Sequence, residues 1–171
     1  MKNIYLFFIF LLLTGCGYNL ALNNETIPVL CPSILFGSGH TAYIGSTAEN
    51  ISLDNIEYQG KINNALFTKK CTIKKDVFFS ELSILFIVKP LIDEINLINL
   101  PFYVAILNQN KELQDILYFS ALGKFNINLE TNNAIETDIT KILTIQHENI
   151  NESSIIIIGY ILDEKREEIL N

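Results

Sequence analysis

Short stretches in which apolar and polar residues alternate run through much of this chain, and they constrain its fold more than any other feature. Ile56, Tyr58, Gly60 and Ile62 alternate with polar residues, and residues 77–88 keep one side almost wholly apolar. A period of two is typical of a β-strand that buries one face, whereas a helix repeats about every 3.6 residues. The pattern therefore predicts β-strands over both stretches.

Turn residues separate the other predicted strands. Residues 102–107 and 116–121 flank the polar run 108–111, which predicts a hairpin. Residues 91–101 have mixed periods with a proline at each side, and we expect a loop or short helix packed over the sheets there. Further strands are predicted over residues 34–36, 125–130 and 135–145, with a bulge at Gly123 and a short charged helix over residues 163–170.

The segment 154–162 is apolar at both odd and even positions. Such a strand is expected in the middle of a sheet with both faces covered, because an exposed apolar edge promotes aggregation. About six to eight short strands, few helical patterns and regular turns favour an all-β fold. We predict a single antiparallel β-sandwich domain over residues 31–171, of the immunoglobulin-like type.

The first residues follow a different pattern. Lys2 supplies one positive charge, residues 4–13 are uninterruptedly apolar, and Gly15 stands before Cys16. This is the layout of a secretory signal peptide. The apolar run rises only about 15 Å as a helix, roughly half of the hydrocarbon thickness of a bilayer, so it is too short for a membrane span.

Residues 13–16, Leu-Thr-Gly-Cys, resemble the lipobox of bacterial lipoprotein precursors. The resemblance implies that residues 1–15 are removed and that Cys16 is diacylated and then acylated at its new amine. Several acyl chains provide the stable anchoring that a single chain does not. Gly17 after the cysteine implies, by the sorting behaviour of such lipoproteins, the periplasmic face of the outer membrane. The alternative is an ordinary signal peptide with a coincidental cysteine.

Residues 16–30 then form a lipidated cysteine and a tether. Loss of Lys2 with the signal peptide changes the net charge from −7 to −8. An acidic chain is repelled by nucleic acid and by anionic lipid surfaces, so we expect the lipid anchor to hold it at the membrane and no nucleic acid to be bound.

The chain has three cysteines. With Cys16 assigned to lipid, Cys31 and Cys71 remain as a pair in an oxidising compartment, which predicts a disulfide. Closing the intervening loop contributes about 4 kcal/mol in the chain-entropy model. Metal ligation is the weaker alternative, because the sequence has no CxxC motif and only two histidines.

Four short segments are spread over the mature chain: Cys31-Pro32, Glu57-Tyr58 leading to Cys71, residues 100–106 and residues 159–162. Together they resemble an uncharacterised family of alphaproteobacterial envelope lipoproteins. The resemblance implies an envelope lipoprotein with two matched cysteines in its body, and it brings no activity and no catalytic residues. Residues 15–19 are similar to the start of lipopolysaccharide-assembly lipoproteins, which is the alternative family.

Several local patterns offer sites without meeting the requirements for one. Gly37-Ser38-Gly39-His40 lacks both the glycine spacing of a phosphate loop and the G-x-S-x-G of a nucleophile elbow, so it is interpreted as a flexible loop. The pair His-Glu at 147–148 suggests a metal site with His40, but adjacent strand residues point to opposite faces. Carboxylate pairs at 93–94 and 163–164 are interpreted as solvated surface. Aromatic pairs are interpreted as core, or as the lining of a cavity or partner groove, at 78–79, 102–103 and 118–119.

We therefore predict no catalytic residues, no metal and no cofactor, and a non-enzymatic role in envelope structure or assembly through an envelope protein partner. Three hypotheses differ in what the fold must contain. An interaction module needs an exposed strand edge or apolar patch, and a lipid or small-molecule carrier needs a cavity between the sheets of about 300 Å³ or more. An enzyme needs histidine and carboxylates clustered in a cleft.

Overall fold

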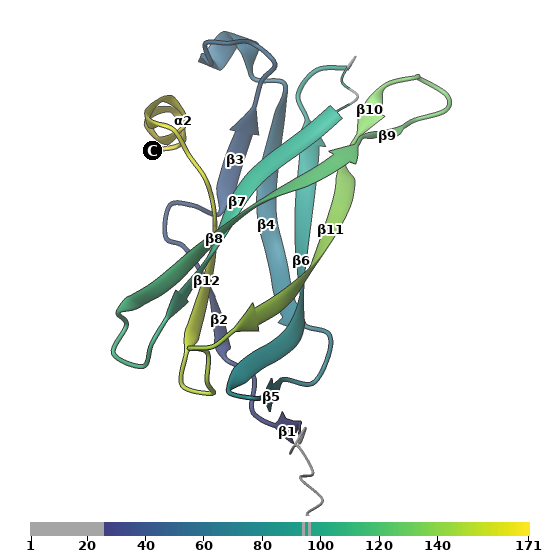
Figure 1. Ribbon diagram of the computed structural model, residues 1–171. Helices are drawn as coiled ribbons and strands as arrows, with labels where there is room; N and C mark the ends of the chain where they lie inside the picture. The colour runs from purple at the N-terminus through teal and green to yellow at the C-terminus, as the bar shows by residue number, and fades with distance from the viewer. Residues whose placement is uncertain (1–25, 94, 96) are drawn as a thin grey trace, which may run out of the picture.

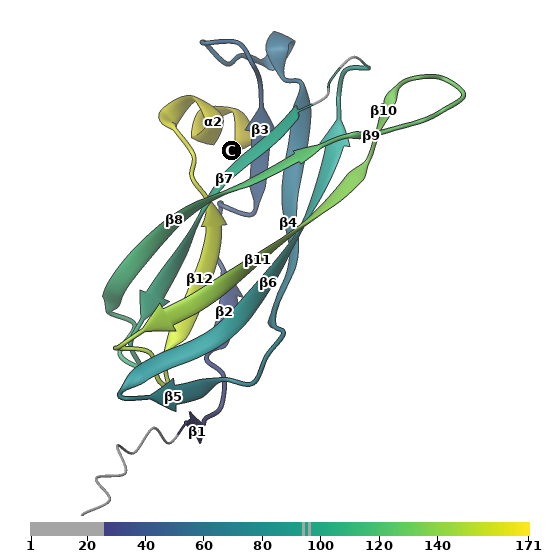
Figure 2. The same ribbon diagram turned by 45° about the vertical axis from the view of Figure 1, so that its right-hand side comes forward.

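A computed structural model describes residues 26–93, 95 and 97–171 of the chain. The predicted all-β sandwich is confirmed: two mainly antiparallel sheets pack face to face along the length of the molecule (Figures 1 and 2). The 3-10 turn η1 (Leu53–Asn55) and the helix α2 (Glu164–Leu170) lie at the end of the sandwich remote from β1 (Ile27–Pro28). No helix in the described ranges is long and apolar enough to cross a membrane.

Sheet A is organised around β6, the longest strand. β11 pairs with nearly the whole of β6, whereas β4 pairs with its second half and β5 with its first residues. β11 therefore lies along one edge of β6, and β4 and β5 share the other. The strands of sheet A are β1 (Ile27–Pro28), β3 (Ala42–Gly45), β4 (Tyr58–Phe67), β5 (Thr72–Lys74), β6 (Val77–Pro90) and β11 (Thr137–His147).

Sheet B has the order β2-β12-β7-β8. All its pairs are antiparallel except the parallel pair of β2 and β12. Its strands are β2 (Ser33–Phe36), β7 (Leu97–Leu107), β8 (Leu113–Lys124) and β12 (Ile155–Tyr160). The remaining elements are the small hairpin of β9 (Asn126–Ile127) and β10 (Ala134–Ile135), the 3-10 turn η1 (Leu53–Asn55) and the helix α2 (Glu164–Leu170).

The core lies between the two sheets and consists of alternate residues of the long strands. Phe86 of β6, Phe102 of β7 and Tyr160 of β12 are fully buried. The ring of Phe86 lies 5.2 Å from that of Phe102 and 5.9 Å from that of Tyr160, between centroids. Aromatic contacts of this kind add about 0.5–1.5 kcal/mol each to the burial of apolar area. The predicted inward side of residues 77–88 is confirmed, because its apolar residues are buried.

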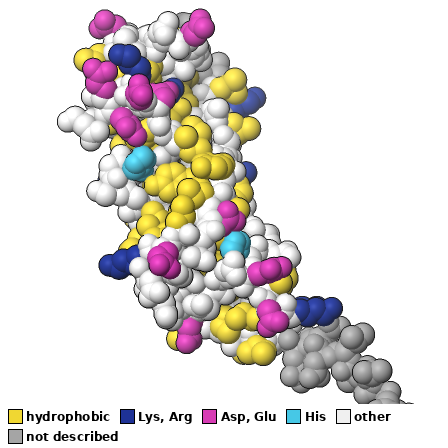
Figure 3. All heavy atoms as spheres, turned by 60° about the vertical axis from the view of Figure 1, so that its left-hand side comes forward, with side chains coloured by type: hydrophobic (Ala, Val, Ile, Leu, Met, Phe, Trp, Pro, Cys, Tyr) yellow, Lys and Arg dark blue, Asp and Glu magenta, His cyan; other side chains and the backbone are white. Residues whose placement is uncertain are grey.

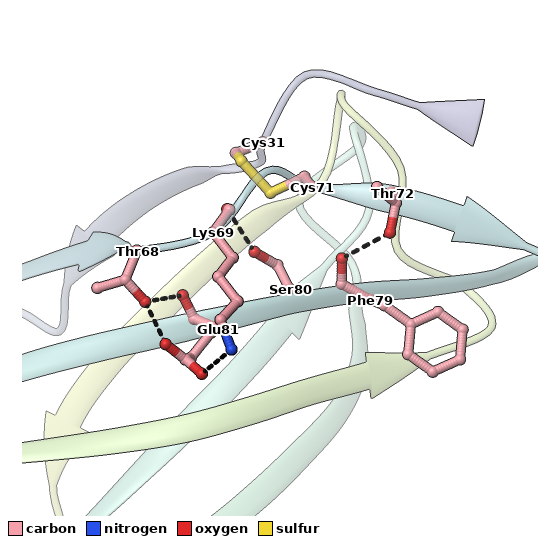
Figure 4. The surroundings of a disulfide bond; sticks show 8 residues. All are labelled: Cys31, Thr68, Lys69, Cys71, Thr72, Phe79, Ser80 and Glu81. Carbon is pink, nitrogen blue, oxygen red and sulfur yellow. Dashed lines mark hydrogen bonds and ion pairs between the residues drawn. A yellow bond between two sulfur atoms is a disulfide. The ribbon is translucent and has the colours of Figure 1, made fainter. Parts of the chain in front are cut away.

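The predicted disulfide between Cys31 and Cys71 is present, with the two Cα atoms 5.2 Å apart. It joins the segment before β2 to the segment before β5, and thus ties the two sheets together at one end (Figure 4). Beside it, Ser80 Oγ donates to the Lys69 carbonyl oxygen at 3.0 Å. In antibody domains the disulfide joins two central strands instead, so the immunoglobulin-like type is not confirmed.

Two local predictions are wrong. Leu97–Pro101, predicted as loop or helix, is the first half of β7, because Ile98 and Leu100 bury against the core at alternate positions. Gly123 is not a bulge: it pairs regularly with Ile98, and the register shift of this hairpin lies between Ile106 and Leu107. A Cβ on Gly123 would lie 2.6 Å from Ile139 Cδ1, so glycine there allows β8 to approach β11.

Candidate interaction surface

The outer side of sheet B is formed by the residues that alternate with its core residues. On β7, Phe102 and Val104 are fully buried, whereas Tyr103 between them reaches the surface. The strand register aligns these outer residues into rows across the sheet. One row runs through Ile116 of β8, Ala105 of β7, Ile157 of β12 and Leu35 of β2, all of them apolar.

We call this surface the sheet B face. Four large apolar residues on it are strongly exposed: Leu122 is 71% exposed, Tyr118 67%, Leu97 67% and Leu35 51%. Ser33, Asn99 and Lys124 on the same face are exposed as well. Figure 3 shows hydrophobic side chains gathered along the middle of one side of the molecule, with white polar and backbone atoms among them. The sheet B face consists of Ser33, Leu35, Leu97, Asn99, Pro101, Tyr103, Ala105, Leu107, Ile116, Tyr118, Ser120, Leu122, Lys124, Ile155, Ile157 and Gly159.

Charge is nearly absent from this set of residues. Lys124 is its one ionisable charge at neutral pH, and it lies opposite Leu97 at the end of the β7–β8 ladder. An apolar band of this length on a chain with 18% charged residues is a specific feature, because exposed apolar residues normally occur singly.

Glycine makes room for the Tyr103 side chain in the middle of the sheet B face. A Cβ on Gly159 would lie 2.6 Å from the Tyr103 hydroxyl oxygen and 2.9 Å from His40 Cβ, and one on Gly37 would lie 2.6 Å from the same hydroxyl. The Tyr103 side chain therefore lies across the two glycines, and its partial burial raises the pKa of the phenol. His40 packs edge-on against Tyr103 with ring centroids 5.9 Å apart.

The sheet A face, on the opposite side of the sandwich, is mixed in character. Glu81, in the part of β6 near the disulfide, accepts hydrogen bonds from Lys69 Nζ and Thr68 Oγ1, both at 2.7 Å (Figure 4). The Lys69 and Thr68 hydrogen bonds hold the pKa of Glu81 below its ordinary value. The exposed positions of β11 on this face include Asp138, Thr140 and Ile142.

The predicted site residues divide into two groups. Cys16 lies outside the described residues. Cys31 and Cys71 are joined, which excludes them as metal ligands or free thiols. Among residues 26–93, 95 and 97–171, no three His, Cys, Asp or Glu side chains gather closely enough to hold a metal ion.

The two histidines have separate structural partners. His40 Nδ1 donates to the Tyr160 carbonyl oxygen at 3.0 Å, so the predicted flexible loop at 37–40 is fixed to β12. His147 Nε2 donates to Asp115 Oδ2 at 3.2 Å, while its Nδ1 accepts from the Asn149 amide. A surface hollow of about 460 Å³ lies beside His147, lined by Val77, Gln146, Glu148 and Asn149.

The remaining candidates are mostly structural. Asp163 caps α2, because its Oδ1 accepts from the Arg166 amide at 2.8 Å. Glu94 of the pair at 93–94 lies outside the described residues. The aromatic pairs are split by strand alternation: Phe102 and Phe119 stack inside the sandwich with centroids 5.6 Å apart, whereas Tyr103 and Tyr118 are paired across β7 and β8 on the sheet B face.

Sequence reasoning missed this surface. The segment 154–162 is central in its sheet, as predicted, but the outer side of Ile155 and Ile157 is only partly buried. The sequence signal for this surface was that segment 154–162 is apolar at both odd and even positions.

No protein-family model matches the sequence, and no curated protein or solved structure shows significant similarity to it.

Proposed function

We propose that the protein is a lipid-anchored envelope lipoprotein that acts without catalysis, as an interaction module, and that the sheet B face is its contact surface. The observation that carries this proposal is the nearly uncharged apolar band on one outer face of the sandwich. Large apolar patches on soluble domains are typical of contact sites, because their exposure to water is unfavourable.

The cellular location is argued from the sequence. Residues 13–16 resemble a lipobox, and acyl chains on Cys16 anchor the domain at the periplasmic face of the outer membrane. The disulfide between Cys31 and Cys71 supports this location, because such bonds form and persist in oxidising compartments. The aromatic rings that fill the middle of the sandwich give the carrier hypothesis no support there.

The anchor is tested by fractionation. Wild-type protein is expected in the membrane fraction after a high-salt wash, and Cys16→Ser is expected in the soluble fraction. Retention of Cys16→Ser in washed membranes would contradict the lipid anchor.

The contact surface is tested with two charge-matched double variants. Tyr118→Lys with Leu122→Lys places two cations on the sheet B face, and Thr140→Lys with Ile142→Lys places two on the sheet A face. After chemical crosslinking of intact envelopes, the sheet B variant is expected to lose the protein adducts of the wild type, and the sheet A variant to keep them. Equal adducts in both variants would contradict the assignment of the surface.

A further inference from the structure

Resting on the proposed function, we propose that the partner on the sheet B face is a second copy of this chain. The two copies pack sheet against sheet, each covering the same residues of the other, as in a twofold-symmetric dimer. Such an interface is isologous, so every group on the surface must tolerate its own copy nearby. Three properties of the sheet B face fit that condition.

The first property is the distribution of charge. The chain carries a net charge of −7, so two copies repel each other over most of their surfaces. The sheet B face contains no Asp or Glu, and its single cation, Lys124, lies at one end. Contact through this face therefore buries no acidic group against its own copy. A partner of opposite charge, by contrast, is selected by complementary charges on the surface, which this face lacks.

The second property is composition. Homodimer interfaces are more apolar than interfaces between proteins that exist separately, with depletion of charge and enrichment of aromatic residues at the centre. Tyr103 and Tyr118 pair across β7 and β8 on this face, beside Ala105 and Ile116. Tyr118 is 67% exposed in the single chain, which leaves most of its ring available for burial.

The third property is shape and size. Gly37 and Gly159 lie under the Tyr103 side chain, so this ring lies close against the sheet and leaves room for a second copy above it. The four strands lie about 4.8 Å apart and contain 4, 6, 11 and 12 residues, about eight on average, so the sheet covers about 500 Å². A pair of copies therefore buries about 1,000 Å², which is the area expected of a weak specific interface.

The test uses site-specific photocrosslinking of the full-length protein in the bacterial envelope. Tyr118 is replaced by p-benzoylphenylalanine, an aromatic residue of similar shape, and the chain is co-expressed in two forms with different epitope tags. Thr140→p-benzoylphenylalanine is the matched control, because Thr140 is exposed on the sheet A face. A mobility shift on reduction of the Cys31–Cys71 disulfide confirms that both variants are folded.

After irradiation we expect a product of doubled mass that carries both tags from the position-118 protein, and none above background from the position-140 protein. Adding Leu122→Lys to both copies is expected to reduce the yield. A position-118 product that contains a different protein and a single tag would overturn the second copy but leave the proposed function standing. Absence of any protein product at position 118 would overturn both.

Discussion

The two outer faces of this sandwich differ sharply although the sheets share one core. On the sheet A face, Glu81 and Asp138 lie among partly buried apolar residues, and Thr140 and Thr144 are two of the outward residues of β11. On the sheet B face, the outward positions of β7 and β12 include Tyr103, Ala105 and Ile157. The sheet A face shows that this fold tolerates polar residues on an outer surface. The apolar residues of the sheet B face are therefore not required by the fold, and we interpret them as residues of contact.

The same difference is visible along single strands. β11 alternates between core residues such as Ile145 and exposed polar residues such as Thr144, which leaves one face in water. β12 is apolar at nearly every position, yet its alternate residues Ile155 and Ile157 stay partly exposed. A strand that is apolar on both sides is favoured by a cover on both sides, and the contact that we propose supplies the second.

The largest expected effect separates inner from outer positions on sheet B. Phe102→Ala removes a fully buried ring and is expected to reduce the free energy of unfolding by about 3–5 kcal/mol. Tyr118→Ala removes an exposed ring and is expected to change the free energy of unfolding by less than about 1 kcal/mol. Denaturant unfolding of dilute purified protein checks both. Similar losses for the two variants would mean that the sheet B face is part of the folding core.

The disulfide joins segments of the two sheets, so we expect it to stabilise the whole domain and not one outer face. Replacing Cys31 and Cys71 by serine is expected to reduce the free energy of unfolding by up to about 4 kcal/mol, because the unfolded chain regains the entropy of an open loop. Denaturant midpoints of the double variant and the wild type measure the loss. An unchanged midpoint would show that the link does not constrain the unfolded chain.

Gly159→Ala tests how closely Tyr103 packs over β12 at the centre of the sheet B face. The new methyl group meets the Tyr103 hydroxyl and His40, and we expect a loss of about 1–3 kcal/mol from overpacking. The control is Thr140→Ala on the sheet A face, whose free energy of unfolding is expected to lie within about 0.5 kcal/mol of the wild-type value. Thermal unfolding measures both, and a neutral Gly159→Ala would contradict the close packing of Tyr103 over β12.

The smallest expected effect lies on the sheet A face and depends on pH. Lys69 and Thr68 favour the ionised form of Glu81 and lower its pKa from the ordinary value of 4.5. The stabilisation is therefore present above this value and is lost as the pH falls below it. We expect the wild type to exceed Glu81→Gln in melting temperature near neutral pH, with the difference shrinking in acid. A difference that is independent of pH would contradict the pairing.

Strand positions and the core were largely predictable, because alternation and burial are local properties of the sequence. The alternation of residues 77–88 identified the inward side of β6, and the cysteine count identified the partner of Cys31. The sheet B face was not predictable, because it depends on the order of strands far apart in the chain. Leu35, Ile157, Ala105 and Ile116 come from four separate segments, and only their pairing makes them one row.

The most direct test of the sheet B face is whether it is covered in the envelope. Leu122→Cys and Thr140→Cys place single reactive thiols on the two outer faces, and a small maleimide reports their accessibility in intact envelopes and in dilute purified protein. We expect both thiols to react readily in dilute protein, and only Leu122→Cys to become slow in the envelope. Equally fast reaction of both thiols in the envelope would contradict a contact through the sheet B face.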